Sequence, residues 1–142
     1  MTLAAFGTFA ISAIEISKLP AAVQKTVKEE TKNATAVKVS KETEGGKTLY
    51  EVESRVKGRG RDLMVNAQGM VVSIEEEMLL ADIPPAASAG ILKVAMGGTI
   101  GKIEAVTKGG LVTYEAVITK KGLKKTEVMV HGDGSVANLV AK

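Results

Sequence analysis

The chain has 142 residues, the size of one domain, and its composition is ordinary for a globular protein, with 45% hydrophobic and 25% charged residues. It contains no cysteine, which excludes disulfides, thiolate metal sites and a cysteine nucleophile. The net charge of +3 is unevenly spread. Residues 19–82 hold ten basic and eleven acidic side chains (−1), and residues 83–142 hold eight and four (+4). A field of this size can bias which partners approach, but it does not indicate a nucleic-acid-binding protein.

The first 13 residues, MTLAAFGTFAISA, carry no charge. A helix needs about 20 apolar residues to span a bilayer, so this segment is too short to do so. It resembles the apolar region of a secretory signal peptide, with small residues at Ser12 and Ala13 where cleavage would occur, but the basic residues that normally precede such a region are missing. The alternative is a buried N-terminal element of the fold.

The first half of the chain predicts one helix followed by four strands. Leu19, Val23 and Val27 recur every four residues as an apolar stripe, and Pro20 suits the first turn, where its missing N–H is not needed. Alternating apolar residues and glycine-containing turns then predict an antiparallel meander. The strands centre on residues 37–39, 50–56, 63–65 and 70–74, with turns at residues 44–47, 57–61 and 66–69. The carboxylates Glu75 to Glu77 are expected to close this unit as a solvated charge run.

The second half repeats the first. The stretch GGKTLYEVE at residues 45–53 recurs as GGLVTYEAV at residues 109–117, and Gly69 corresponds to Gly134. We therefore predict an α+β fold of two tandem pseudo-symmetric units. Each unit is a helix followed by a four-stranded antiparallel meander, with the helices packed on the sheet. Repeat 1 covers residues 14–77 and repeat 2 covers residues 78–142, after the apolar segment 1–13. The glycine pairs form hairpins, and Tyr50 and Tyr114 are expected in the core or at the seam between units.

The second predicted helix, residues 84–96, differs from the first because Lys93 is its single charged residue. A helix that is apolar nearly all round is usually buried, here against the first unit or against residues 1–13. The alternative is an exposed contact surface for a partner.

Several short motifs together resemble a known family. They are Leu19-Pro20-Ala21-Ala22-Val23, the Gly-Gly hairpin, Tyr50-Glu51-Val52-Glu53, and the Gly69 turn followed by Val71-Val72. In this order they resemble the PepSY-like domain family, also described as beta-lactamase-inhibitor-like, in two tandem copies from about Ile14 onwards. The resemblance implies an extracytoplasmic module of two joined units, as in the beta-lactamase inhibitor protein. Related PepSY domains occur in metallopeptidase propeptides, where an inhibitory or chaperoning role is supposed, whereas the stand-alone PepSY-like proteins have no firm activity. The apolar second helix and the missing cysteines depart from this pattern.

Residues suited to catalysis are sparse, so no enzyme, cofactor or metal site is predicted. His131 is the single histidine and lies at a predicted turn, without the second histidine of a typical zinc site or a nucleophile motif for a serine triad. Glu51 and Glu115 recur at equivalent places in the two halves. Without a pocket such a pair is a weak catalytic signal, and we interpret both as solvated strand carboxylates.

Two predicted hairpins are basic at equivalent positions. They are either solvated tips that guard strand edges or a double basic rim facing an acidic partner, anionic lipid or cell-wall polymer. The leading hypothesis is a non-enzymatic periplasmic or secreted protein-binding module, an inhibitor or modulator of an envelope enzyme such as a peptidase. The alternative is a structural or ligand-sequestering envelope protein, and the scarcity of aromatics argues against single-stranded nucleic acid. The candidate binding residues are Arg55, Lys57, Arg59 and Arg61, with Lys120, Lys121, Lys124 and Lys125.

Overall fold

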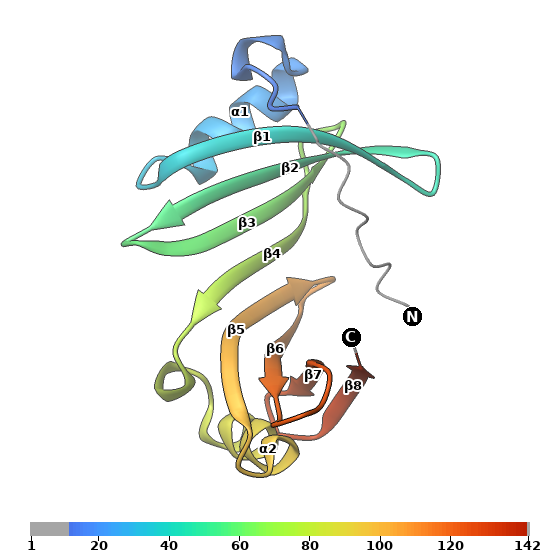
Figure 1. The fold of residues 1–142 in the computed structure, drawn as a ribbon. Helices are drawn as coiled ribbons and strands as arrows, with labels where there is room; N and C mark the ends of the chain where they lie inside the picture. Colours follow the sequence, from blue (N-terminus) through green and yellow to red (C-terminus); the bar gives the residue numbers. More distant parts are fainter. Residues whose placement is uncertain (1–11, 142) are drawn as a thin grey trace.

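A computed structural model describes residues 12–141 and shows one eight-stranded antiparallel sheet with two α-helices packed on it (Figure 1). The strands follow one another in sequence order, so each is hydrogen-bonded to its neighbours in the chain. The fold is therefore α+β, with the predicted numbers of strands and helices. The predicted apolar segment 1–13 lies almost wholly outside the described residues.

The element order is a helix and four strands, twice. The first half contains α1 (Ala21–Glu30), β1 (Thr35–Glu44), β2 (Lys47–Val56), β3 (Arg59–Asn66) and β4 (Val71–Met78). The second half contains α2 (Pro85–Ala95), β5 (Thr99–Lys108), β6 (Leu111–Thr119), β7 (Thr126–His131) and β8 (Val136–Ala141). Short 3-10 turns precede the helices at Ile16–Lys18 and Leu80–Asp82. Among the described residues, no helix is long and apolar enough to cross a membrane.

Two boundaries differ from the sequence prediction. The turn expected over residues 57–61 is only Lys57-Gly58, and β3 begins at Arg59. The prediction that Glu75 to Glu77 end the first unit as a solvated charge run was wrong, because these residues belong to β4. Since β4 is hydrogen-bonded to β3 on one side and β5 on the other, its backbone pairing holds the strand despite the three adjacent carboxylates.

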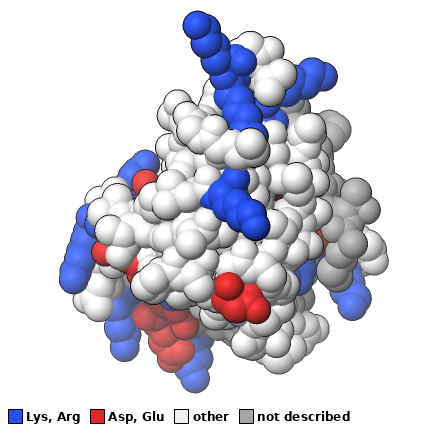
Figure 2. Space-filling model, turned by 90° about the horizontal axis from the view of Figure 1, so that it is seen from below, with Lys and Arg blue, Asp and Glu red and all other residues white. Residues whose placement is uncertain are grey.

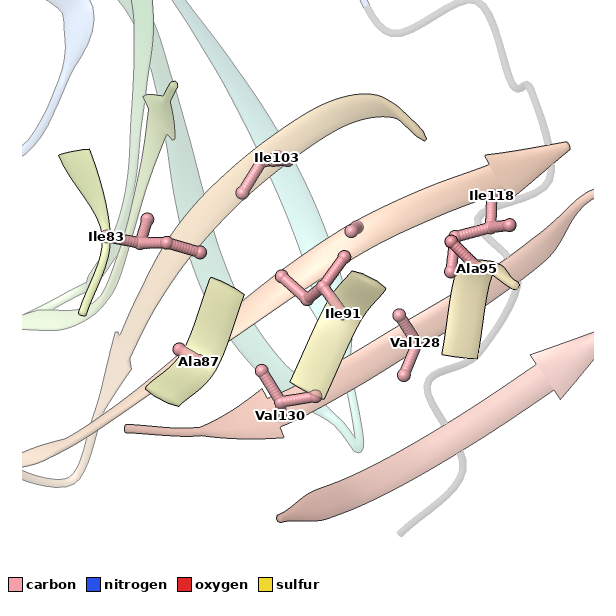
Figure 3. Packing of buried hydrophobic residues seen from close by; sticks show 9 residues of the cluster. Ile83, Ala87, Ile91, Ala95, Ile103, Ile118, Val128 and Val130 are labelled. Atoms are coloured by element: carbon pink, nitrogen blue, oxygen red, sulfur yellow. The ribbon is translucent and has the colours of Figure 1, made fainter. Parts of the chain in front are cut away.

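The helices cover the same face of the sheet, and each has its own hydrophobic cluster. Under α1 the buried residues include Val23, Val27 and Tyr50. Under α2 they include Ala87, Ile91 and Ala95 of the helix with Ile103, Ala116, Ile118, Val128 and Val130 of β5 to β7 (Figure 3). Tyr50 is thus a core residue as expected, and Tyr114 packs partly buried against the second cluster.

The α2 helix buries one side on β6 and β7 and leaves the other exposed. Leu92 is 51% exposed and Met96 is 80% exposed. The helix is thus buried on one side as expected, but its contacts are mainly with strands of its own half and not with the first unit. Its outer side faces solvent, and a partner contact there stays a prediction. Seen from the α2 end, much of the surface is uncharged, with basic side chains near its centre and around its periphery and acidic side chains toward its lower edge (Figure 2).

Glycines in two turns let the helices approach the sheet closely. Gly69, between β3 and β4, has φ +83°, and a Cβ there would lie 2.6 Å from the Ala22 carbonyl oxygen. Gly134, between β7 and β8, has φ +87° and meets the Ala86 carbonyl in the same manner. The Thr26 hydroxyl also donates to the Gly69 carbonyl at 2.5 Å. Both helices are therefore fixed over the sheet, and the opposite face stays open.

Candidate functional site

The open face of the sheet, opposite the helices, is lined by carboxylates. Side chains alternate between the two faces of a strand. Val52, Leu63 and Ala116 are buried on the helix side, so the residues before and after each of them lie on the open face. No helix or strand covers this face within residues 12–141. We call this surface the acidic face. Its carboxylates are Glu42, Glu51, Glu53, Asp62, Glu75, Glu77, Glu104, Glu115 and Glu127.

Several of these carboxylates lie directly opposite one another on neighbouring strands. Asp62 on β3 pairs with Glu53 on β2 and with Glu75 on β4. Glu104 on β5 pairs with Glu77 on β4 and with Glu115 on β6. Like charges in directly opposed positions destabilise a sheet, by about 0.2–1 kcal/mol per pair. The acidic face therefore contains two rows of mutually repelling groups, one centred in each half of the sheet.

This crowding perturbs the ionisation of the central carboxyl groups. Burial raises the pKa of Glu51 from 4.5 to about 7, with further contributions from Glu42 and Glu53. Burial likewise raises the pKa of Glu115 to about 7, assisted by Glu127 and Glu104. The interpretation of Glu51 and Glu115 as solvated carboxylates was therefore wrong. Both are half-buried in the open face, where neighbouring strands hold further carboxylates against them.

The same causes act on the groups between these two glutamates. Burial raises the pKa of Asp62, and the nearby Glu53 adds to this while Lys102 opposes it. The pKa of Glu75 is also raised, mainly by its partial burial and secondly by the negative charge of Glu104. Although burial lowers the pKa of Lys102, its contact with Glu104 outweighs this effect and raises it.

Basic and apolar side chains accompany the carboxylates. The Lys38 ammonium lies 3.4 Å from the Glu53 carboxylate, and Lys102 pairs with Glu104. Both lysine side chains are about half exposed, so these pairs are screened by solvent. Arg55 and Lys108 share this face by the same alternation, and acidic side chains still outnumber basic ones. The half-buried apolar residues among the charges are Met64, Val106, Val117 and Met129.

The first basic hairpin, β2–β3, is largely engaged within the chain. Arg61 is 18% exposed and contacts the Glu30 carboxylate at 2.9 Å. Arg59 pairs with Asp82 at 3.2 Å, and Arg55 donates to the Gly58 carbonyl at 3.0 Å. Lys57, with φ +50°, is exposed at the turn. Arg61 therefore fastens the hairpin to α1, and Arg59 fastens it to the segment before α2.

In the second basic hairpin, β6–β7, three of the four lysine side chains are exposed to solvent. Lys120 is half-buried beside Gly98, while Lys121, Lys124 and Lys125 are exposed and, within the described part of the chain, form no ion pair. Both basic hairpins lie at the same end of the strands. The β4–β5 connection, which contains α2, separates them.

Groups suited to catalysis do not gather in the residues that the structure describes. His131 ends β7 instead of lying in the following turn, and it is opposite Thr113. No cluster of three metal-ligating side chains occurs in residues 12–141. One cavity of about 280 Å³ lies at the C-terminal end of α1, and its lining includes the Arg61–Glu30 pair, Asn33 and Glu76. These residues offer neither a nucleophile nor a general base positioned beside one.

Sequence analysis did not identify the acidic face, although its signal was present. Glu51 and Glu53 alternate with buried residues in β2, and Glu115 does so in β6. The missing information was the register. The pairing of β2 with β3 places Asp62 opposite Glu53, and the pairing of β5 with β6 places Glu104 opposite Glu115. The pairing of β4 with β3 and β5 then adds Glu75 and Glu77 to these rows.

Comparison with known proteins identifies the fold. No family model matches the chain, and no curated protein matches its sequence. Solved structures do match. The chain is similar to a protein of Bacteroides eggerthii DSM 20697 described as "putative periplasmic", with a TM-score of 0.76, 14% identity and coverage of 87% of this chain and 88% of that chain.

Two further structures share the fold. One is a DUF2874 family protein from Bacteroides uniformis ATCC 8492, with a TM-score of 0.74, 17% identity, and 86% and 88% of the two chains covered. The other is a BLIP-like protein from Bacteroides fragilis NCTC 9343, with a TM-score of 0.68, 18% identity and 84% of each chain covered. The chain therefore has the BLIP-like fold that the sequence resemblance implied.

Proposed function

We propose that this chain is a non-enzymatic, extracytoplasmic protein-binding module, and that its acidic face receives a cationic surface of a partner protein. The observation that carries the proposal is the pair of opposed carboxylate rows, Glu53–Asp62–Glu75 and Glu77–Glu104–Glu115, on a face that no described element covers. A partner that places lysines or arginines over these rows would relieve their repulsion. The energy released would add to binding, because the cost is already present in the free protein.

The physical character of the face supports a protein partner over a small ligand. A protein interface needs several hundred Å² on each side, with apolar contacts among the polar ones. The acidic face extends over seven strands, β1 to β7, and places Met64, Val106, Val117 and Met129 between its charges. By contrast, the cavity beside α1 is small and lined mainly by polar and charged groups.

Extracytoplasmic location and an inhibitory role are supported by the neighbours' names and by the sequence. The structural neighbours include proteins described as "putative periplasmic" and as BLIP-like. The N-terminal segment resembles the apolar region of a signal peptide, without the basic residues that normally precede it. We propose that the partner is an envelope enzyme such as a peptidase, which the chain inhibits or modulates. We further propose that the two halves are tandem PepSY-like copies, in keeping with the repeated helix-and-four-strand order.

The test compares capture by two variants of equal net charge. Asp62→Asn with Glu104→Gln neutralises the centre of each row, and Glu15→Gln with Glu29→Gln removes two exposed carboxylates elsewhere. Immobilised wild-type protein should retain a stoichiometric protein from an envelope extract at low salt and lose it as salt rises. The face variant should lose most of this binding and the control should keep it. Equal retention by both variants would rule out the acidic face.

The alternative function keeps the second basic hairpin as the binding site, since Lys121, Lys124 and Lys125 are exposed. In this case the chain would bind anionic lipid or polymer. Co-sedimentation with vesicles containing 30% anionic lipid separates the two functions. Lysine-dependent sedimentation that is lost in Lys124→Glu with Lys125→Glu would favour the alternative, and no sedimentation would leave the acidic face as the candidate site.

A further inference from the structure

The outer edge of β8 has no strand beside it among the described residues, because β8 ends the sheet. Such an edge presents a row of unpaired backbone N–H and C=O groups, which can pair with another chain. The sequence of β8, VANLVA, contains no charge and no proline. Val136 is 51% exposed, Leu139 is 55% exposed and Val140 is 41% exposed. These are features that chains normally avoid on a free edge.

The opposite edge of the sheet, β1, is protected. It carries Lys38, Lys41 and Glu42, and its pairing is irregular between Thr35 and Lys38, where Ala36 has φ +52°. In addition, the Ile14 N–H donates to the Val39 carbonyl at 2.7 Å, so the chain itself occupies part of this edge. Charges, bulges and covering segments all discourage edge-to-edge pairing. Within residues 12–141, the chain therefore guards one edge and leaves the other without a neighbouring strand.

We propose that two copies of this chain pair through β8 in antiparallel orientation, so that the sheet continues from one copy into the next. The strand can pair with a second copy of itself because it contains no charged residue, so pairing brings no like charges together. In a two-fold antiparallel pair, opposed residues share a face, so one residue must lie opposite itself. The register that centres on Leu139 places the two Leu139 side chains together on the helix side and Asn138 opposite Val140 on the other side.

This dimer keeps the acidic faces compatible. The two-fold axis is perpendicular to the sheet, so both α2 helices lie on one side and both acidic faces on the other. The outermost acidic residue is Glu127 on β7, opposite Val140. Two copies of Glu127 would be separated by three strand spacings, about 14 Å. That exceeds the screening length of about 8 Å at physiological salt, so repulsion across the junction is weak.

Sedimentation velocity of the full chain between 5 and 500 µM tests the proposal. The mass should rise from 14.8 kDa towards twice that value, with a dissociation constant in the micromolar range because the contact is small. Leu139→Lys should weaken dimerisation at least tenfold. The matched control, Leu111→Lys, changes a residue of nearly equal exposure, 57%, on β6 and should shift it less than twofold.

Two further measurements make the outcome decisive. Circular dichroism checks that each variant is folded. If Leu139→Lys is not, Val140→Lys supplies the charge on the face away from α2. Hydrogen exchange should show amides of residues 136–141 becoming more protected as concentration rises, while those of β1 stay constant. A monomer at 500 µM, equal effects of Leu139→Lys and Leu111→Lys, or concentration-independent exchange in β8 would each overturn the proposal.

Discussion

Neutralising Glu51 or Glu115 should stabilise the protein at alkaline pH and flatten its dependence on pH. Each carboxyl has a folded pKa of about 7 against an ordinary value of 4.5. A carboxyl with a raised folded pKa binds protons more tightly in the folded state. Its favourable contribution is therefore fully present below about pH 4.5 and is lost as the pH rises through 7. Wild-type stability should accordingly fall between pH 5 and pH 8.

The magnitude follows from the size of the shift. A shift of about 2.5 units corresponds to about 3.4 kcal/mol if transferred in full. Both side chains are half-buried and not fully buried, so solvent screening reduces this to about 1 kcal/mol each. Glu51 and Glu115 lie on β2 and β6, at least about 19 Å apart because four strand spacings separate them, so their effects should nearly add. The double variant Glu51→Gln with Glu115→Gln should gain about 2 kcal/mol at pH 8 and close to nothing at pH 4.5.

Urea unfolding followed by circular dichroism at half-unit pH steps measures this directly, with Glu29→Gln on the exposed side of α1 as the control. The control should follow the wild-type curve at every pH. The reasoning is refuted if wild-type stability is flat or rises between pH 5 and pH 8. It is equally refuted if the glutamine variants are no more stable than the control at pH 8.

Three further substitutions test the packing that holds the acidic face in place. Ile91→Ala, in the core under α2, should cost about 2–5 kcal/mol in urea unfolding, whereas Leu92→Ala on the exposed side of the same helix should cost less than about 0.5 kcal/mol. Gly134→Ala should destabilise measurably because its φ is +87° and its Cβ would strike the Ala86 carbonyl, while Gly132→Ala, which has open space, should be nearly neutral. Arg61→Met should lower the melting temperature by removing the pair with Glu30, and Lys57→Met at the exposed turn should not.

The sequence was sufficient to predict most of the fold because its signals are local. The stripe of Leu19, Val23 and Val27 produced α1, and paired glycines such as Gly45-Gly46 marked the hairpins. The prediction failed at Glu75 to Glu77, where a local rule about charge runs competed with non-local pairing. There β4 is an interior strand with partners on both sides, and this pairing outweighs the unfavourable local composition.

The acidic face depends on non-local contacts, so it could not be read from the sequence in the same manner. Glu51 and Glu115 each look like ordinary exposed positions of an alternating strand. Their pKa values rise mainly because the folded sheet half-buries them, and further because Glu42 and Glu127 approach Glu51 and Glu115 from neighbouring strands. Both causes exist only after the register is fixed. The basic hairpins show the converse. In the sequence, the four alternating cationic residues from Arg55 to Arg61 look like a solvent-exposed basic rim. In the structure, Arg59 and Arg61 have carboxylate partners from distant parts of the chain.

The two kinds of charge placement have different consequences for stability, and the contrast supports a binding role for the acidic face. Where the chain closes the β2–β3 hairpin against α1, opposite charges meet, as in Arg61 and Glu30. On the open face, Asp62 and Glu104 each meet two further carboxylates across the strands. A lysine at either position would turn two repulsions into attractions without disturbing the alternation that builds the core. The fold therefore does not require this arrangement, and this is the reason for proposing that the acidic face receives a cationic surface of a partner.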